Sequence, residues 1–191
     1  PPNVFVPMLE SLGLIDEVGA WVIVQALAET ADWSAVDDGF RVAVNVSPLQ
    51  LNRETFADRV LELIAGVTRG TQRLELEVTE STLMADPRRA SASLARLRDA
   101  GITIAIDDFG TGHSSLRVLA GLPVDVLKID RSFVRDITTN RSNRLIVQTT
   151  INLANSLGLK TVAEGVETNE QAAVLADLGC WSIQGYLIRK P

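Results

Sequence analysis

Histidine and cysteine are almost absent from the 191-residue sequence, which holds one of each, His113 and Cys180. A lone cysteine cannot form an internal disulfide, and it is compatible with a reducing compartment. A single histidine excludes a zinc site built from several histidines. Long apolar runs are also missing: the longest candidate, at 21–28, is interrupted by Gln25, so we expect no transmembrane span within the chain.

Basic residues are too few for a nucleic-acid-binding protein. The chain carries 18 Lys and Arg against 24 Asp and Glu, a net charge of −6. Binding of DNA or RNA polymers needs clustered basic residues, so we expect neither. A small anionic ligand is still compatible with this charge if metal ions offset the carboxylates. The composition, 46% hydrophobic and 22% charged, is that of one ordinary globular domain.

The start of the chain, PPNVFVP, resembles a loop and lacks both an initiator Met and the basic and apolar regions of a signal peptide. We therefore expect a cytoplasmic domain with further sequence upstream of Pro1, which leaves open a membrane anchor elsewhere in the whole protein.

Short runs of branched apolar residues alternate with longer helical patterns. The runs predict strands at 41–47, 73–81, 102–109, 124–130, 160–165 and 182–187. Helices are expected at 56–66, 87–100, 141–157 and 170–178, and one or two helices within 10–30. Asn52 or Thr55 could cap the first of these helices, and Asp86 caps the second. Strands that alternate with helices indicate an α/β fold with a parallel sheet.

The faces of the strands favour a barrel. In the first strand Val42, Val44 and Val46 share one face, whereas Asn45 lies on a smaller, more polar face. This pattern fits a (β/α)8 barrel of the TIM type, and an open doubly wound sheet is the competing architecture. No strand is followed by the glycine-rich phosphate loop typical of the open sheet. A complete barrel needs about 250 residues, so we expect six of eight units, with residues 1–191 forming a partial domain whose first two strands lie upstream.

Polar side chains recur where the predicted strands end. They are Asn45, Glu77, Glu80, Asp107, Asp108, Lys128, Asp130, Glu164, Glu167 and Gln184. In a parallel barrel these ends meet at one rim, where barrel active sites lie. So many carboxylates imply bound cations, raised pKa values, or both.

The residue types predict a site for two hard metal ions. Asparagine and carboxylate oxygens suit Mg²⁺, Mn²⁺ or Ca²⁺, and the doublet Asp107–Asp108 could contact two ions at once. Two such ions can polarise a phosphate and activate a water for in-line attack. Lys128 and Glu164 could then position or deprotonate that water.

Six segments of the chain resemble consecutive motifs of the EAL-domain family. They are VNVSPLQL (44–51), LELEVTES (74–81), IAIDDFGTGHSSL (104–116), VLKIDRSFV (126–134), VAEGVET (162–168) and QGYLIRKP (184–191). Residues 5–23 are similar to the early helical region of this family. The resemblance implies a (β/α)8 barrel and a phosphodiesterase that converts the bacterial second messenger cyclic di-GMP to linear pGpG.

The resemblance also implies a role for each residue. Asn45, Glu77 and Asp107 resemble ligands of a first Mg²⁺ or Mn²⁺ ion, and Asp107 and Asp108 resemble ligands of a second. Lys128 and Glu164 match the catalytic residues that handle the attacking water. Supporting or substrate-binding positions are matched by Glu80, which steadies the loop 109–115, and by Asp130, Glu167 and Gln184. The family further implies inhibition by Ca²⁺, a homodimer, and linked sensor or diguanylate-cyclase domains.

The chain departs from the family pattern at three places. The Glu-Ala-Leu segment, with its metal-binding glutamate, is absent from residues 1–191, His113 stands where tyrosine is usual, and Trp181 stands where an acidic residue is common. We therefore expect the intact domain to be active and this chain alone to be inactive or poorly stable. The alternatives are a non-catalytic cyclic di-GMP receptor or signalling interaction module, and an acid-rich metal barrel that acts on carbon acids.

Overall fold

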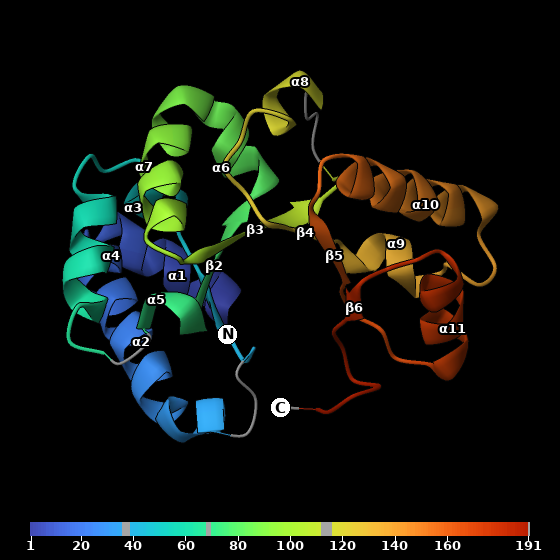
Figure 1. The fold of residues 1–191 in the computed structure, drawn as a ribbon, viewed down its shortest axis with the longest axis horizontal. Helices are drawn as coiled ribbons and strands as arrows, with labels where there is room; N and C mark the ends of the chain where they lie inside the picture. The colour runs from blue at the N-terminus through green and yellow to red at the C-terminus, as the bar shows by residue number, and fades with distance from the viewer. Residues whose placement is uncertain (36–38, 68–69, 112–115, 191) are drawn as a thin grey trace. The chain divides into compact units, whose positions relative to one another are not determined.

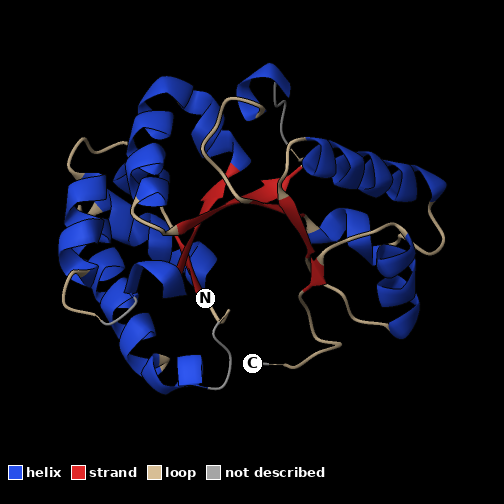
Figure 2. Cartoon of the chain, in the orientation of Figure 1, coloured by secondary structure: helices blue, strands red, loops and turns tan. Residues whose placement is uncertain are grey.

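The computed structural model describes residues 1–35, 39–67, 70–111 and 116–190 (Figure 1). Its six strands form a sheet whose order follows the sequence, and the pairs β1–β2, β3–β4, β4–β5 and β5–β6 are parallel. The strands are β1 (Val42–Asn45), β2 (Leu74–Thr79), β3 (Thr103–Phe109), β4 (Val126–Ile129), β5 (Lys160–Ala163) and β6 (Ser182–Ile183). Helices separate them along the chain (Figure 2). The predicted parallel α/β arrangement of six strands is confirmed.

The chain divides into two compact units. The first comprises Pro1–Val78 with Ala85–Ile104, and the second comprises Thr79–Met84 with Ala105–Pro191.

The first unit contains β1, β2 and a layer of helices. These helices are α1 (Pro2–Ser11), α2 (Ile15–Glu29), α3 (Pro48–Leu51), α4 (Phe56–Ile64), α5 (Gly70–Arg73) and α7 (Pro87–Asp99), with a 3-10 helix at Ala31–Ala35. The apolar faces of α2, α7 and β2 supply its core. Fully buried members include Leu27, Leu74, Leu76, Val78, Leu94 and Leu97. As predicted from strand parity, Val44 is buried whereas Asn45 is exposed.

The second unit contains β4–β6, most of β3, and the remaining helices. They are α6 (Glu80–Ala85), α8 (Leu116–Leu119), α9 (Arg131–Arg135), α10 (Arg141–Ser156) and α11 (Asn169–Asp177). Every residue of β4 is buried, and Figure 1 shows α9, α10 and α11 on one side of β4–β6. Helix α10 begins where the Asn140 side chain accepts hydrogen bonds from the N–H groups of Ser142 and Asn143. Among the described helices, none is both long and apolar enough to cross a membrane.

Several sequence predictions about the elements need correction. The segment PPNVFVP is not a loop, because α1 begins at Pro2, and proline suits the first turn of a helix, where its missing N–H costs nothing. Most strands are shorter than predicted. Glu80 and Asp130, which were expected at strand ends, instead begin α6 and cap α9, respectively. Thr55 precedes α4 without a side-chain capping bond, whereas Asp86 does cap α7 by accepting from Arg89 N–H at 3.2 Å. The predicted features at Gly112, His113, Ser114 and Ser115 lie outside the described residues.

Candidate functional site

Three carboxylates of the second unit converge at the carboxyl ends of β3 and β5. One ligand oxygen from each of Asp107, Asp108 and Glu164 lies within 4.8 Å of the other two. Lys128, at the end of β4 and 3% exposed, lies against them. Its Nζ is 2.6 Å from Glu164 Oε1 and 3.4 Å from Asp107 Oδ1. Four of the predicted site residues are therefore brought together.

An irregularity in β3 lets two consecutive residues enter one cluster. Neighbouring residues of a regular strand point to opposite faces. Here the register between β3 and β4 shifts between Ile106 and Phe109, and Asp108 has a φ of 54°, a conformation that aspartate tolerates better than most residues. The Asp108 N–H also donates to Asp107 Oδ1 at 3.0 Å. These features explain how both carboxylates approach Glu164.

The surroundings of the cluster shift the pKa values of two carboxyl groups in opposite directions. Burial, then the charge of Asp107, then the contact with Asp130 raise the pKa of the Asp108 carboxyl above its ordinary value. Burial also opposes ionisation of Asp130, but hydrogen bonds donated by the hydroxyl and N–H of Ser132, with one from Asp108, hold its pKa below the ordinary value. The Asp108 carboxyl is therefore harder to ionise than the Asp130 carboxyl.

Glu80 holds the backbone that follows β3. Its side chain is 2% exposed, and its Oε2 accepts a hydrogen bond from Gly110 N–H at 2.9 Å. Gly110 has a φ of 99°, and a Cβ there would lie 3.0 Å from the Phe133 ring. The sequence prediction placed Glu80 at a strand end, and this is wrong: Glu80 is the first residue of α6.

A cavity of about 660 Å³ lies beside Glu164 in the second unit. Its lining includes Arg131, Glu164, Glu167, Gln171, Gln184 and Tyr186. The predicted residues Glu167 and Gln184 thus share a cavity with Glu164. Sequence reasoning missed Arg131, Gln171 and Tyr186. A signal for Gln171 was present, since Thr168 and Gln171 have the spacing of a helix capping box.

Asn45 and Glu77 lie together in the first unit. They are register partners in the β1–β2 pair, and the N–H of Val46 donates to the Glu77 carbonyl at 2.9 Å. Asn45 is exposed, whereas Glu77 is buried. Their membership of one metal site with Asp107 stays a prediction.

The donor set of the second unit fits a hard divalent cation. Asp107, Asp108 and Glu164 offer only oxygen, which is the donor that Mg²⁺, Mn²⁺ and Ca²⁺ prefer. Lys128 supplies one positive charge to the cluster, so a bound cation would relieve the remaining repulsion between carboxylates. The cluster can therefore bind a metal ion.

The chain is similar to several known proteins. The chain is 44% identical to a signalling protein of Caulobacter vibrioides and 41% identical to the cyclic di-GMP phosphodiesterase NbdA of Pseudomonas aeruginosa. Each match covers the whole chain, which spans 23% and 24% of these two relatives, respectively. The solved structure of the PaMucR phosphodiesterase in complex with c-di-GMP matches with 40% identity and a TM-score of 0.94, over all of this chain and 77% of that one.

The likeness to PaMucR confirms the predicted fold class, because the EAL-type α/β fold is matched along the entire chain. The sequence model of the EAL domain matches residues 1–191. The chain belongs to the EAL domain family.

Proposed function

We propose that the protein containing this chain hydrolyses cyclic di-GMP to linear pGpG. The observation that carries the proposal is the cluster of Asp107, Asp108 and Glu164 around the buried Lys128. Membership of the EAL family and the likeness to phosphodiesterases, one of them in complex with c-di-GMP, support the substrate.

We propose that two Mg²⁺ or Mn²⁺ ions bind the domain, the first through Asn45, Glu77 and Asp107 and the second through Asp107 and Asp108. When bound, such ions polarise the scissile phosphate and lower the pKa of a water. Ca²⁺ binds the same oxygens without supporting turnover.

The protein's own contribution to catalysis centres on Lys128 and Glu164. The ion pair of 2.6 Å orients the Glu164 carboxylate. An ionised carboxylate held in this way can accept a proton from the attacking water. Lys128 also contacts Asp107 at 3.4 Å. It therefore holds Glu164, the proposed base, close to a proposed metal ligand.

The supporting residues act on the surroundings of the reacting atoms. Glu80 fixes the backbone at Gly110, and Asp130 contacts Asp108, which limits the positions open to that side chain. Glu167 and Gln184 line the cavity beside Glu164, where they contact the nucleotide.

We propose that residues 1–191 are a partial EAL domain whose first two strands lie upstream. The whole of this chain covers 77% of the PaMucR chain, so that structure is longer than this chain. The greater length of the curated relatives supports linked sensor or diguanylate-cyclase domains. A homodimer is part of the same proposal.

The test is hydrolysis of cyclic di-GMP by the full-length protein with Mg²⁺ or Mn²⁺. Formation of pGpG is expected, and Glu77→Gln should lower kcat by more than about 100-fold, since even partners of metal ligands typically cost about 10–100-fold. Glu75→Gln is the matched control, because Glu75 lies on β2 two residues nearer the strand's amino end.

The absence of metal-dependent pGpG would overturn the catalytic proposal. Calorimetric binding of cyclic di-GMP with Ca²⁺, without turnover in Mg²⁺ or Mn²⁺, would instead indicate a receptor.

A further inference from the structure

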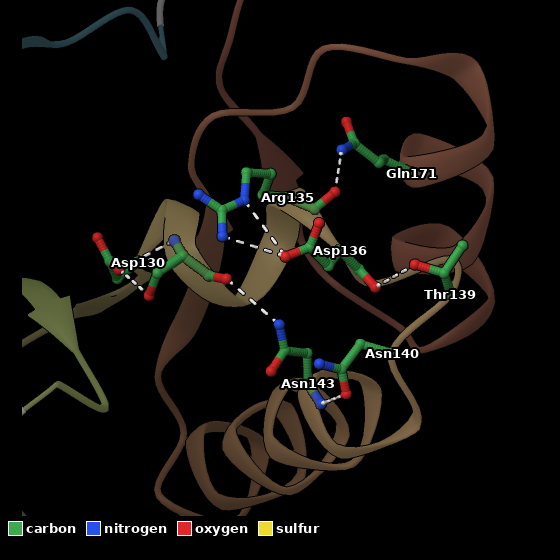
Figure 3. A network of polar contacts seen from close by, with 8 residues as sticks. Asp130, Arg135, Asp136, Thr139, Asn140, Asn143 and Gln171 are labelled. Carbon is green, nitrogen blue, oxygen red and sulfur yellow. Dashed lines mark hydrogen bonds and ion pairs between the residues drawn. The ribbon is translucent and has the colours of Figure 1, made fainter.

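The side chain of Gln171, in the first turn of α11, makes hydrogen bonds at both ends of its amide. It is 6% exposed. Its Oε1 accepts from the N–H groups of Glu167 at 2.8 Å and Thr168 at 3.0 Å. Its Nε2 donates to the carbonyl of Arg135 at 3.0 Å, as Figure 3 shows.

These bonds join the segments that follow two neighbouring strands. Arg135 ends α9, and Asp130, which caps the start of α9, comes two residues after Lys128. Glu167 comes three residues after Glu164. Gln171 therefore connects the backbone beyond Lys128 to the backbone beyond Glu164, and these are the two side chains whose charged atoms lie 2.6 Å apart.

The segment at 164–168 packs against the start of α9 and the residue that ends β4. The Glu164 N–H donates to the Ile129 carbonyl at 3.1 Å. Gly165 has a φ of 66°, and a Cβ there would lie 2.6 Å from Arg131 Cβ, so this segment lies directly against the first residue of α9. At the other end of the segment, the hydrogen bonds of the Gln171 side chain connect it to α9.

The bond to Arg135 exceeds what helix capping requires. Thr168 and Gln171 form a capping box, in which Thr168 Oγ1 accepts from Gln171 N–H and Gln171 Oε1 accepts from Thr168 N–H. The capping box uses only the oxygen of the glutamine side chain. The donation from Nε2 to Arg135 adds nothing to α11 itself, but it fixes the distance between α11 and α9.

We propose that Gln171 is a positioning residue that sets where Glu164 lies relative to Lys128 and the acidic cluster. This inference rests on the proposed phosphodiesterase function for its effect on turnover, and on the geometry alone for its effect on metal binding. Glu164 offers one of the three oxygens that could hold a metal ion, so its displacement would affect metal binding as well as turnover. Groups that orient metal ligands typically affect metal affinity or activity by about 10–100-fold.

The decisive variant is Gln171→Glu in the full-length protein. It keeps the Oε1 acceptor but replaces the Nε2 donor by an oxygen that repels the Arg135 carbonyl. We expect kcat for pGpG formation to fall about 10–100-fold with little change in KM, and calorimetry with Mn²⁺ alone to show affinity weakened by a similar factor. Amide exchange at Glu167 and Thr168 should stay protected, because Oε1 is retained.

The matched control is Thr168→Val, which removes the hydroxyl of the same capping box and keeps the bond to Arg135. It should lower the unfolding midpoint while kcat and Mn²⁺ affinity stay at wild-type values. Gln171→Leu should lose the exchange protection of the Glu167 and Thr168 amides as well as the activity. Comparison with Gln171→Glu therefore distinguishes the effect of Oε1 from that of Nε2.

Wild-type kcat and Mn²⁺ affinity in Gln171→Glu would overturn the inference, as would equal losses in Thr168→Val. If the wild-type protein showed no turnover, the phosphodiesterase proposal would be refuted, but the positioning role of Gln171 would not. In that case the Mn²⁺ affinity of Gln171→Glu decides: a weakened affinity supports the positioning role, and an unchanged affinity rejects it.

Discussion

Replacement of Lys128 by methionine tests how strongly the carboxylates depend on a buried cation. Lys128 is 3% exposed, and the side chains of its partners Asp107 and Glu164 are 13% and 20% exposed. Methionine keeps the unbranched shape and most of the length of the side chain but leaves two carboxylates close together without the ammonium. Removal of one partner from a buried ion pair typically costs about 3–5 kcal/mol. We expect the low end, about 3 kcal/mol, because the carboxylates are partly solvated.

The measurement is thermal unfolding in EDTA. A loss of about 3 kcal/mol corresponds to a fall in Tm of about 6–12 °C, since each kcal/mol shifts a chain of this size by about 2–4 °C. Glu164→Gln removes the charge left unpaired, so the loss on Lys128→Met should shrink in that background. Lys160→Met is the control, because Lys160 is exposed and packs on the Trp181 ring, a contact that contributes about 0.5–1 kcal/mol.

Two results would refute this reasoning. One is a Lys128→Met protein as stable as the Lys160→Met control. The other is an undiminished loss in the Glu164→Gln background, which would show that packing rather than charge accounts for the effect. Addition of Mg²⁺ should also stabilise Lys128→Met more than wild type, because the variant lacks its own cation.

Three further predictions concern the scaffold. Leu94→Ala, in the fully buried face of α7, should cost about 2–5 kcal/mol and lower the denaturation midpoint at an unchanged m-value. Gly185→Ala should cost about 1–3 kcal/mol, seen as faster amide exchange around β6, because a Cβ would collide with the Val166 backbone. Arg96, chiefly by its hydrogen bond, lowers the pKa of the exposed Asp58 carboxyl, so the pair stabilises the fold above the unfolded pKa of about 3.9. This contribution to stability is lost as pH falls through the lower pKa that Asp58 has in the folded protein. Asp58→Asn should therefore melt at a lower temperature than wild type at neutral pH, but at the same temperature at pH 2. High salt should reduce the difference at neutral pH.

The strands and most helices could be predicted because local chemistry determines them. Asp86 followed by Pro87 and then an apolar pattern predicts the start of α7, where the structure confirms it. The prediction of a loop at the beginning of the chain is wrong. Two prolines near a terminus suggest a loop, whereas Pro2 occupies the first turn of α1. Strand ends were overextended because capping residues such as Asp130 directly follow the strand.

The convergence of Asp107, Lys128 and Glu164 could be predicted because parallel strands bring their carboxyl ends to one edge. The positive φ of Asp108 and the register shift in β3 could not, since both depend on how β4 pairs with its neighbour. The contact between Gln171 and Arg135 could not be predicted from the sequence either, because its two partners are 36 residues apart. The capping box alone predicts the oxygen contacts of Gln171 and is silent about its nitrogen.

A charge balance explains why this cluster favours a cation. Asp107 and Glu164 share the ammonium of Lys128, while the pKa of Asp108 is raised by burial and by its acidic neighbours. One lysine thus offsets part of the repulsion among three carboxylates, and Asp108 is harder to ionise than a free aspartate. Because a carboxylate binds a divalent cation in its ionised form, metal affinity should increase as pH rises through the pKa of Asp108. A fold that only needed stability could have used apolar side chains here, so the proposed cation site gives this acidic cluster a role that stability alone does not require.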